Sequence, residues 1–179
     1  MEYLHLALPP HSRTVLQPID LKWAPPNPHC YKLNSDGASC PTTGLAGYGG
    51  VIRDSNGNWI VGYSGSTVHT TSLHMELMGL LQGLRLAQER NLTPLEVFVD
   101  AKEVIHVLNV GNLLYSHILN DCRSVLHQLA DPPVTHTYRE QNQVVDAMAK
   151  HGLREYCGPL MLVFEDAPIF VLKILLTDK

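Results

Sequence analysis

Apolar and polar residues begin to alternate regularly only after about residue 30 of the chain. The first such run, Tyr31–Asp36, is typical of a strand, and Gly37 ends it. Two further strand-like runs, Gly47–Arg53 and Trp59–Ser64, flank the segment Asp54–Gly57. That segment ends in an Asn-Gly step, which is a strong hairpin signal between two such runs. The pattern therefore predicts an antiparallel meander of three strands.

After residue 70 the apolar residues recur at helical spacing instead. Ser72 is the expected N-cap of a first helix that runs to about Arg90, and Asn91 ends this helix. The further elements, in chain order, are a short strand over Leu95–Asp100, helices near residues 102–109 and 116–129, a strand over Val134–Arg139 and a helix over Asn142–Glu155. This order is βββαβαβα when the two short helices count as one connection. It predicts an α/β fold in which helices flank a mixed sheet.

Length and proline content divide the chain into one domain with two flanking segments. A chain of 179 residues corresponds to about one domain and is long enough to bury its own core. Residues 1–29 are rich in proline and show no sustained period, so we expect an extended lead-in there. The domain itself is expected over residues 30–157, with a C-terminal extension over residues 158–179 that packs on it.

The charge balance limits how the chain can bind a polyanion. The chain carries 13 lysine and arginine residues against 17 aspartate and glutamate residues, a formal net charge of −4. Lys102, Arg123 and Lys150 are scattered, which is typical of a solvated face rather than of a binding stripe. A nucleic acid would therefore have to be held by local features or by bridging cations, with an affinity that falls steeply as salt rises.

The cysteines and the apolar segments indicate where in the cell the protein is located. Cys30, Cys40, Cys122 and Cys157 form no CxxC pair, so the sequence indicates neither a zinc site nor a disulfide framework. Reduced thiols favour an intracellular location, in the nucleus or the cytoplasm. The N-terminal apolar run is too short for a signal peptide, and charged residues interrupt the stretch Leu160–Thr177, so we expect no membrane span. We expect a monomer without an obligate protein partner.

Four acidic residues stand at element ends in the predicted layout. Asp36 ends the first strand, Glu76 lies in the first turns of the first helix, Asp100 ends the fourth strand, and Asp146 lies early in the last helix. If the first and fourth strands are neighbours, their ends meet on one rim of the sheet, where the sites of open α/β sheets form. Clustered carboxylates need a counter-charge and suit Mg²⁺ or Mn²⁺, two of which can activate water and stabilise the leaving oxygen of a phosphodiester.

A purely structural role is the alternative for each acid taken alone. Acids are common at strand ends and in first helical turns because they favour turns and interact well with the helix dipole. The joint pattern, with each acid at the position that a shared site requires, favours the metal site.

The segments around these acids resemble a known family. They are KLNSDGA at residues 32–38, GGVIRD at 49–54, MELM at 75–78 and REQNQVVD at 139–146. Together they are similar to the type 1 ribonuclease H superfamily, and most similar to the plant retroelement-type, reverse transcriptase-like domains. The resemblance extends over about residues 23–178. It implies a five-stranded mixed sheet flanked by helices.

The resemblance also implies an activity and roles for particular residues. Asp36, Glu76, Asp100 and Asp146 match the metal-binding set, and the implied activity is two-metal hydrolysis of the RNA strand in RNA–DNA hybrids. Two Mg²⁺ ions, or Mn²⁺ in their place, would be the cofactors. Gly37, Ala38 and Ser72 match the places that contact the 2′-hydroxyls of the RNA strand, and Ser72 has the second interpretation of a plain helix cap.

Two residues compete for an auxiliary catalytic role. His136 has the spacing at which bacterial relatives carry a mobile histidine, which could move protons near neutral pH. Arg139 matches the arginine that other members use, which could only steady charge on a phosphate. The expected position of Arg139 at a strand end near the acids favours it. Asn142 either caps the last helix or touches substrate.

Two other function classes remain as alternatives. A retroelement-derived module that binds nucleic acid or a partner without cutting would keep the fold and lose turnover. An actin-like ATPase shares this type of fold, but it needs two such domains and 179 residues cannot supply both. Metal-dependent cutting of a hybrid is the observation that separates the enzyme from the binding module.

Overall fold

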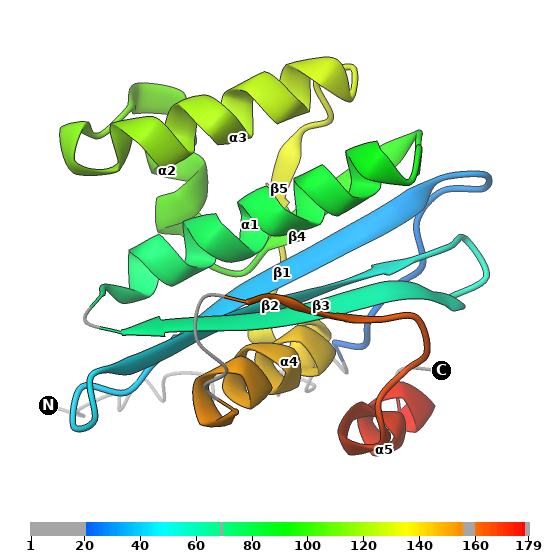
Figure 1. The fold of residues 1–179 in the computed structure, drawn as a ribbon. Helices are drawn as coiled ribbons and strands as arrows, with labels where there is room; N and C mark the ends of the chain where they lie inside the picture. Colours follow the sequence, from blue (N-terminus) through cyan, green and yellow to red (C-terminus); the bar gives the residue numbers. More distant parts are fainter. Residues whose placement is uncertain (1–20, 69, 156–159, 178–179) are drawn as a thin grey trace, which may run out of the picture.

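One mixed sheet of six strands forms the centre of the computed structural model, which describes residues 21–68, 70–155 and 160–177 (Figure 1). The strands are β1 (Tyr31–Ser39), β2 (Leu45–Arg53), β3 (Trp59–Val68), β4 (Leu95–Val99), β5 (Val134–His136) and β6 (Leu162–Phe164). Their order across the sheet is β5-β4-β1-β2-β3-β6. β1 pairs antiparallel with β2 and parallel with β4, so the sheet is mixed, as predicted.

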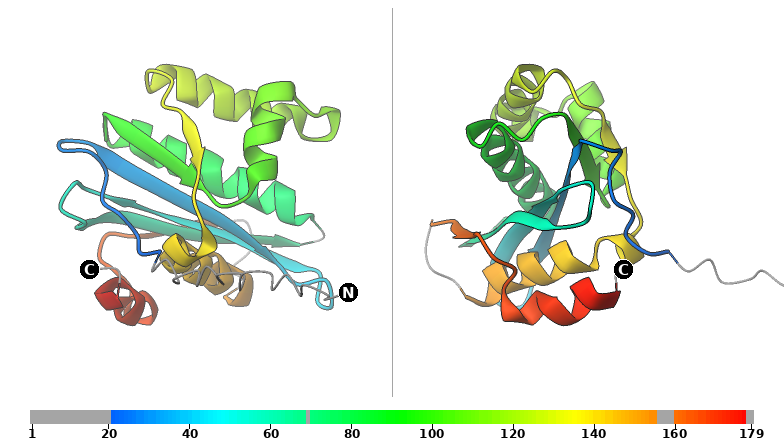
Figure 2. Two further views of the ribbon diagram at one scale, coloured as in Figure 1. Left: turned by 180° about the vertical axis from the view of Figure 1, so that it is seen from behind. Right: turned by 90° about the vertical axis from the view of Figure 1, so that its right-hand side faces the viewer.

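Helices cover both faces of this sheet. They are α1 (Ser72–Glu89), α2 (Lys102–Val110), α3 (Ser116–Gln128), α4 (Gln143–Arg154) and α5 (Ile169–Thr177), with short 3₁₀ helices η1 (Leu113–Tyr115) and η2 (Arg139–Gln141). α1, α2 and α3 lie on one face, and α4 and α5 on the other (Figures 1 and 2). Each face has its own apolar cluster, a large one under α1 and a small one between β2, α4 and α5. The predicted α/β fold class is confirmed.

The sixth strand was not predicted. β6 lies in the C-terminal extension and pairs antiparallel with β3, with Gly62 opposite Phe164. Three residues are too few to show a period of two, so only the pairing with β3 identifies this strand. Val171 of α5, which lies in this extension, is fully buried in the small apolar cluster. Cys157 lies outside the described residues.

Several predicted strand ends are wrong. β2 begins at Leu45 rather than Gly47, and β3 ends at Val68 rather than Ser64. The ends of β1 and β5 also differ, and pairing explains both. β1 continues past Asp36 to Ser39 because its antiparallel ladder with β2 continues to Ser39 and Ala46. β5 ends at His136 rather than at residue 139, because its partner β4 ends at Val99, the residue opposite His136. Arg139 therefore begins η2 instead of ending a strand.

The predicted cap of the first helix is also wrong by one residue. Thr71 is the N-cap, and its hydroxyl accepts a hydrogen bond from the backbone nitrogen of His74 at 3.1 Å. Ser72 is the first residue of α1 and is exposed. Two adjacent hydroxyl residues satisfy the same sequence signal, and only the backbone geometry distinguishes them.

Part of the proline-rich lead-in packs against the sheet. Trp23 is buried, and its indole Nε1 donates to Asn34 Oδ1 of β1 at 3.0 Å. The Arg53 guanidinium lies 4.2 Å from the centre of the same indole ring. The start of the domain near residue 30 stays a prediction, although residues 21–29 follow an irregular path as expected.

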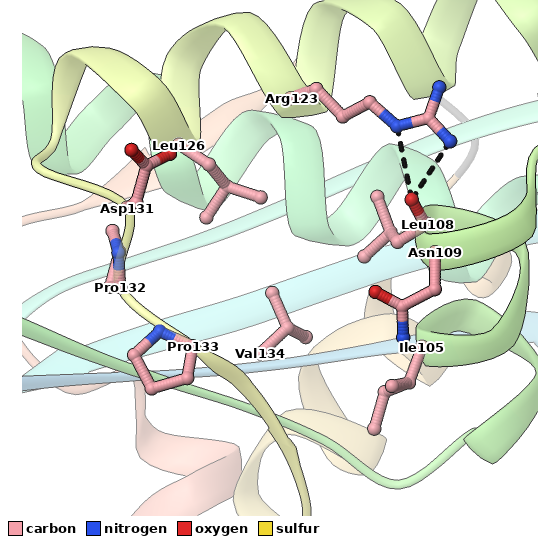
Figure 3. A pocket seen from close by; sticks show the side chains of 9 residues that line it. All are labelled: Ile105, Leu108, Asn109, Arg123, Leu126, Asp131, Pro132, Pro133 and Val134. Atoms are coloured by element: carbon pink, nitrogen blue, oxygen red, sulfur yellow. Dashed lines mark hydrogen bonds between the residues drawn. The ribbon is translucent and has the colours of Figure 1, made fainter.

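Arg123 is exposed, as expected for it, and it also makes a structural contact between two helices. Its Nε and Nη2 donate to the carbonyl oxygen of Leu108 at 3.0 and 2.8 Å (Figure 3). Leu108 lies in the last turn of α2, where carbonyls have no partner within the helix. The contact ties α3 to the end of α2. In the part of the chain that the structure describes, every helix is too short or too polar to cross a bilayer.

Candidate active site

Asp36 and Asp100 lie side by side because β1 and β4 are neighbours in the sheet. The parallel register pairs Ser35 with Val99, and each aspartate is the next residue of its chain. The predicted neighbourhood of the first and fourth strands is therefore confirmed. Asp100 directly follows the end of β4, whereas Asp36 lies where the β1–β4 pairing stops but β1 itself continues.

Glu76 reaches this point because α1 crosses β1 at very short range. A Cβ atom added at Gly37 would lie 2.4 Å from the backbone nitrogen of Glu76, far inside any real contact. On the facing turn of α1, a Cβ added at Gly79 would lie 2.9 Å from the carbonyl oxygen of Asp36. The two glycines therefore let the helix backbone rest on the strand backbone.

The three acids form one carboxylate cluster. Each of Asp36, Glu76 and Asp100 offers an oxygen, and these oxygens all lie within 4.8 Å of one another. Asp36 and Glu76 are buried. The backbone nitrogen of Gly37 donates to Asp36 Oδ1 at 2.8 Å, while Glu76 Oε2 is buried without a hydrogen-bond partner. An unpartnered buried oxygen is costly, which indicates that the cluster is built to hold a positive charge.

Burial and mutual repulsion keep these carboxyls partly protonated when no cation is bound. Burial first, and then the negative charges of Asp36 and Asp100, raise the pKa of Glu76 to about 10. Burial and the neighbouring Asp100 raise the pKa of Asp36 to about 7. Burial also raises the pKa of Asp100, against the opposing effect of the Arg139 guanidinium. A bound cation would replace these protons at neutral pH.

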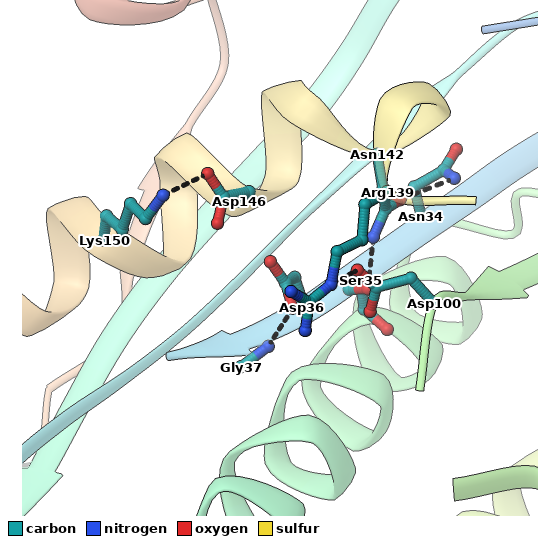
Figure 4. A network of polar contacts seen from close by, with 9 residues as sticks. All are labelled: Asn34, Ser35, Asp36, Gly37, Asp100, Arg139, Asn142, Asp146 and Lys150. Atoms are coloured by element: carbon teal, nitrogen blue, oxygen red, sulfur yellow. Dashed lines mark hydrogen bonds and ion pairs between the residues drawn. The ribbon is translucent and has the colours of Figure 1, made fainter. Parts of the chain in front are cut away.

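The fourth acid lies on the rim of the same pocket, outside the cluster. The pocket is lined by Asp36, Gly37, Asp100, Arg139, Gln143, Asp146 and Lys150. Asp146 accepts a hydrogen bond from Lys150 Nζ at 2.6 Å, one helical turn further along α4 (Figure 4). Gln143 and Lys150 were missed in the sequence. Both residues are three or four positions from Asp146, which places them on the same face of the helix, and this spacing is the sequence signal that would have identified them.

The two auxiliary candidates are placed differently. Arg139 Nε lies 3.7 Å from Asp100 Oδ2, and the Arg139 side chain is 92% exposed, so its guanidinium is free to meet a ligand at the pocket mouth. His136 is half-buried at the end of β5, its ring packs edge-on against Tyr138 at 5.5 Å, and it does not line the pocket. The structure thus brings Arg139 to the acids. The catalytic roles of Arg139 and His136 stay predictions.

Of the remaining predicted substrate-contacting residues, Gly37, Ala38 and Ser72, only Gly37 lines the acidic pocket. Ala38 follows it on β1, half-buried. Ser72 lies one helical turn before Glu76, at the exposed start of α1. Contacts between these three residues and a substrate backbone stay a prediction.

Asn142 occupies the N-cap position of α4, as one alternative expected, but its side chain makes no capping hydrogen bond. Its Oδ1 accepts from Asn34 Nδ2 at 3.0 Å, and its own Nδ2 donates to the Ser35 carbonyl at 3.2 Å. Asn34 in turn accepts from Trp23 (Figure 4 shows the asparagines). This buried network fixes the start of α4 against β1 beside Asp36, and thereby the position of Asp146. Asn34 was missed, although a polar residue within an apolar strand marks it.

Comparison with known proteins agrees with this site and fold. The family of reverse transcriptase-like proteins matches residues 34–152. A protein of Arabidopsis thaliana that carries the name of a ribonuclease H protein is 32% identical over 133 residues, which make up 73% of this chain and 22% of that protein. Ribonuclease H of Sulfurovum sp. is 34% identical over 93 residues, 52% of this chain and 59% of that protein. The chain thus spans less than two thirds of the length of either relative.

A solved structure confirms the fold. The structure of LC11-RNase H1 in complex with an RNA/DNA hybrid matches 70% of this chain and 97% of its own, with a TM-score of 0.63 at 19% identity. The family match covers all four acids and most of the sheet. The chain belongs to the reverse transcriptase-like family of the ribonuclease H superfamily.

Proposed function

We propose that this chain is a metal-dependent endoribonuclease that hydrolyses the RNA strand of RNA–DNA hybrids. The observation that carries the proposal is the cluster of three carboxylates at the β1–β4 junction, in a chain of this family. The names of both curated relatives contain ribonuclease H, and a structural neighbour has been solved with an RNA/DNA hybrid. These findings support a hybrid as substrate.

The residues present fit divalent cations. The donors are carboxylate oxygens only, the set that Mg²⁺ and Mn²⁺ prefer, and the unpartnered Glu76 Oε2 would gain a partner. Asp36, Glu76 and Asp100 would hold such ions, and Asp146 at the rim of the pocket would contribute a further carboxylate. Such ions supply an activated water and neutralise the charge that develops on the leaving oxygen.

The protein's own groups would orient the scissile strand. Gly37 holds Asp36 by its backbone N–H, so the central carboxylate keeps one orientation. Arg139 at the pocket mouth would contact a phosphate with its exposed guanidinium. Backbone groups at Gly37 and Ala38, with the Ser72 hydroxyl, would contact 2′-hydroxyls and so select RNA over DNA.

The test is cleavage of an end-labelled RNA–DNA hybrid with Mg²⁺, with Mn²⁺ and with chelator, comparing the wild-type chain with Asp36→Asn. We expect internal cuts in the RNA strand that require metal and are lost in Asp36→Asn. Asp121→Asn, an exposed aspartate on α3, is the matched control and should cut normally. Hybrid binding without cutting in the folded wild-type chain would instead support the module that binds nucleic acid without turnover.

A further inference from the structure

A second groove runs from the acidic pocket along the outside of α4. It lies between α4 and α5, which are side by side in both views of Figure 2, and has a volume of about 470 Å³. It shares Gln143, Asp146 and Lys150 with the acidic pocket, so the groove and the pocket adjoin each other. One wall belongs to the C-terminal extension rather than to the part of the chain that the family match covers.

The α4 wall presents cations at helical spacing. Lys150 and Arg154 follow Asp146 at intervals of four residues, and all three line the groove. Arg154 is exposed, so its charge can reach a ligand; Lys150 is about half exposed, with its Nζ paired to Asp146 at 2.6 Å. Glu155 ends the row with a negative charge. From Asp146 to Arg154 the helix rises about 12 Å at 1.5 Å per residue.

The α5 wall presents an aromatic ring. Phe170 stacks on His151 with ring centres 4.5 Å apart and planes 8° from parallel, and Phe164 of β6 packs edge-on against both rings. The His151 ring is itself held by Ser64 Oγ at 3.2 Å. Phe170 remains 40% exposed despite these contacts. A fixed aromatic ring in the same groove as basic side chains is a combination that binds nucleic-acid strands.

We propose that the α4–α5 groove binds the continuation of the strand whose phosphate lies at the acids. Lys150 and Arg154 contact phosphates about two nucleotides apart, and Phe170 packs against a sugar or base. The proposal rests on the proposed function, since it extends the same substrate site. A 12 Å track corresponds to three or four nucleotides at about 3.4 Å per step. Binding in this groove explains how a chain with a net charge of −4 can hold a polyanion through local positive charge.

The test is binding of a fluorescent RNA–DNA hybrid, by anisotropy, in chelator so that no strand is cut. We expect Arg154→Ala to weaken binding about tenfold and to lower the slope of log K against log salt by about one. Arg154→Lys should keep that slope. Phe170→Ala should weaken binding about fivefold or more without changing the slope.

Matched controls come from α5. Lys173→Ala removes an exposed cation and Ile169→Ala an exposed apolar side chain, and neither residue lines the groove, so binding should stay unchanged. Thermal unfolding checks that Phe170→Ala is folded; if it is not, the two Arg154 variants decide. A 4-thiouridine placed three nucleotides from the cut should crosslink to α4 or α5.

Different results overturn the two proposals. If the wild-type chain binds and cuts the hybrid while Arg154→Ala matches Lys173→Ala in affinity and slope, the groove proposal is wrong and the proposed function stands. If the folded wild-type chain binds no hybrid at all, both are wrong.

Discussion

Gly37 lies directly beneath the backbone nitrogen of Glu76, with 2.4 Å between that nitrogen and the place of a missing Cβ. Any side chain at residue 37 would push α1 away from β1, and Glu76 would move away from Asp36 with it. The absence of one methyl group is therefore what permits the carboxylate cluster to form.

Gly37→Ala should separate the cluster. The clash is with backbone atoms, which cannot rotate away, so we expect a loss of about 2 kcal/mol or more in unfolding free energy and loss of metal-dependent cutting. Urea unfolding and the hybrid assay measure the two effects. Gly57→Ala is the comparison, because its Cβ would meet only Trp23 at 3.5 Å and its cost comes from a positive φ. Equal cutting activity in Gly37→Ala and Gly57→Ala would contradict the role of Gly37 in forming the carboxylate cluster.

Asp36→Asn should stabilise the metal-free protein at high pH. Burial and the neighbouring acid raise the pKa of Asp36 to about 7, so in the wild type the folded state binds its proton more tightly than the unfolded state does. Stability from this group is therefore present below about pH 4 and is lost as pH rises toward 7. We expect Asp36→Asn to gain on the order of 2 to 4 kcal/mol at pH 8 and nothing at pH 4. Chemical unfolding in chelator at both pH values measures this, and a gain that is independent of pH would disprove the explanation.

Mg²⁺ or Mn²⁺ should raise the unfolding temperature of the wild-type chain. A cation that binds only the folded state stabilises it by about 2.7 kcal/mol at a hundred times its dissociation constant. Glu76→Gln should reduce this effect strongly, since it replaces the buried, unpartnered carboxylate oxygen. Sodium chloride at equal ionic strength is the control. If salt alone reproduces the shift, the cluster holds no specific cation.

Asn142→Ala should loosen α4 from β1. It removes both hydrogen bonds to the strand and leaves the Asn34 amide and the Ser35 carbonyl buried without their partner. We expect a loss of about 2 kcal/mol and a reduced cutting rate, because Asp146 loses its fixed position. Asn120→Ala, an exposed asparagine on α3, should change stability by less than about 0.5 kcal/mol. A full cutting rate in Asn142→Ala would show that the network does not position Asp146.

Arg139→Ala and His136→Ala should differ. Arg139 lies at the pocket mouth 3.7 Å from Asp100, so its loss should lower kcat/KM about tenfold or more, with partial recovery in Arg139→Lys. His136 does not line the pocket, and His136→Ala should stay within about threefold of the wild type. Steady-state kinetics on one hybrid decides between them. The reverse ranking would assign the auxiliary role to His136.

Local patterns were enough to predict much of this protein. Alternation and helical spacing predicted the elements within a few residues, because each pattern reflects burial on one face of a single element. The acids at element ends, with the segments around them, led to the family and to the three carboxylates that do meet. These are properties of short stretches of chain, and they do not depend on how the elements are arranged.

The remaining features were decided by the tertiary structure alone, because they depend on contacts between segments that are distant in the sequence. β6 exists only because β3 has a free edge beside it, and β5 stops only because β4 ends at Val99. Asn142 suits a helix cap by sequence, but the position of Asn34 makes it a bridge to β1. Lys150 appears in the sequence as a scattered charge, but because α5 packs beside α4, Lys150 and Arg154 form one wall of a groove. Whether a polar side chain faces solvent, a strand or a ligand is set by what packs against it, and the residue's own sequence neighbours do not contain that information.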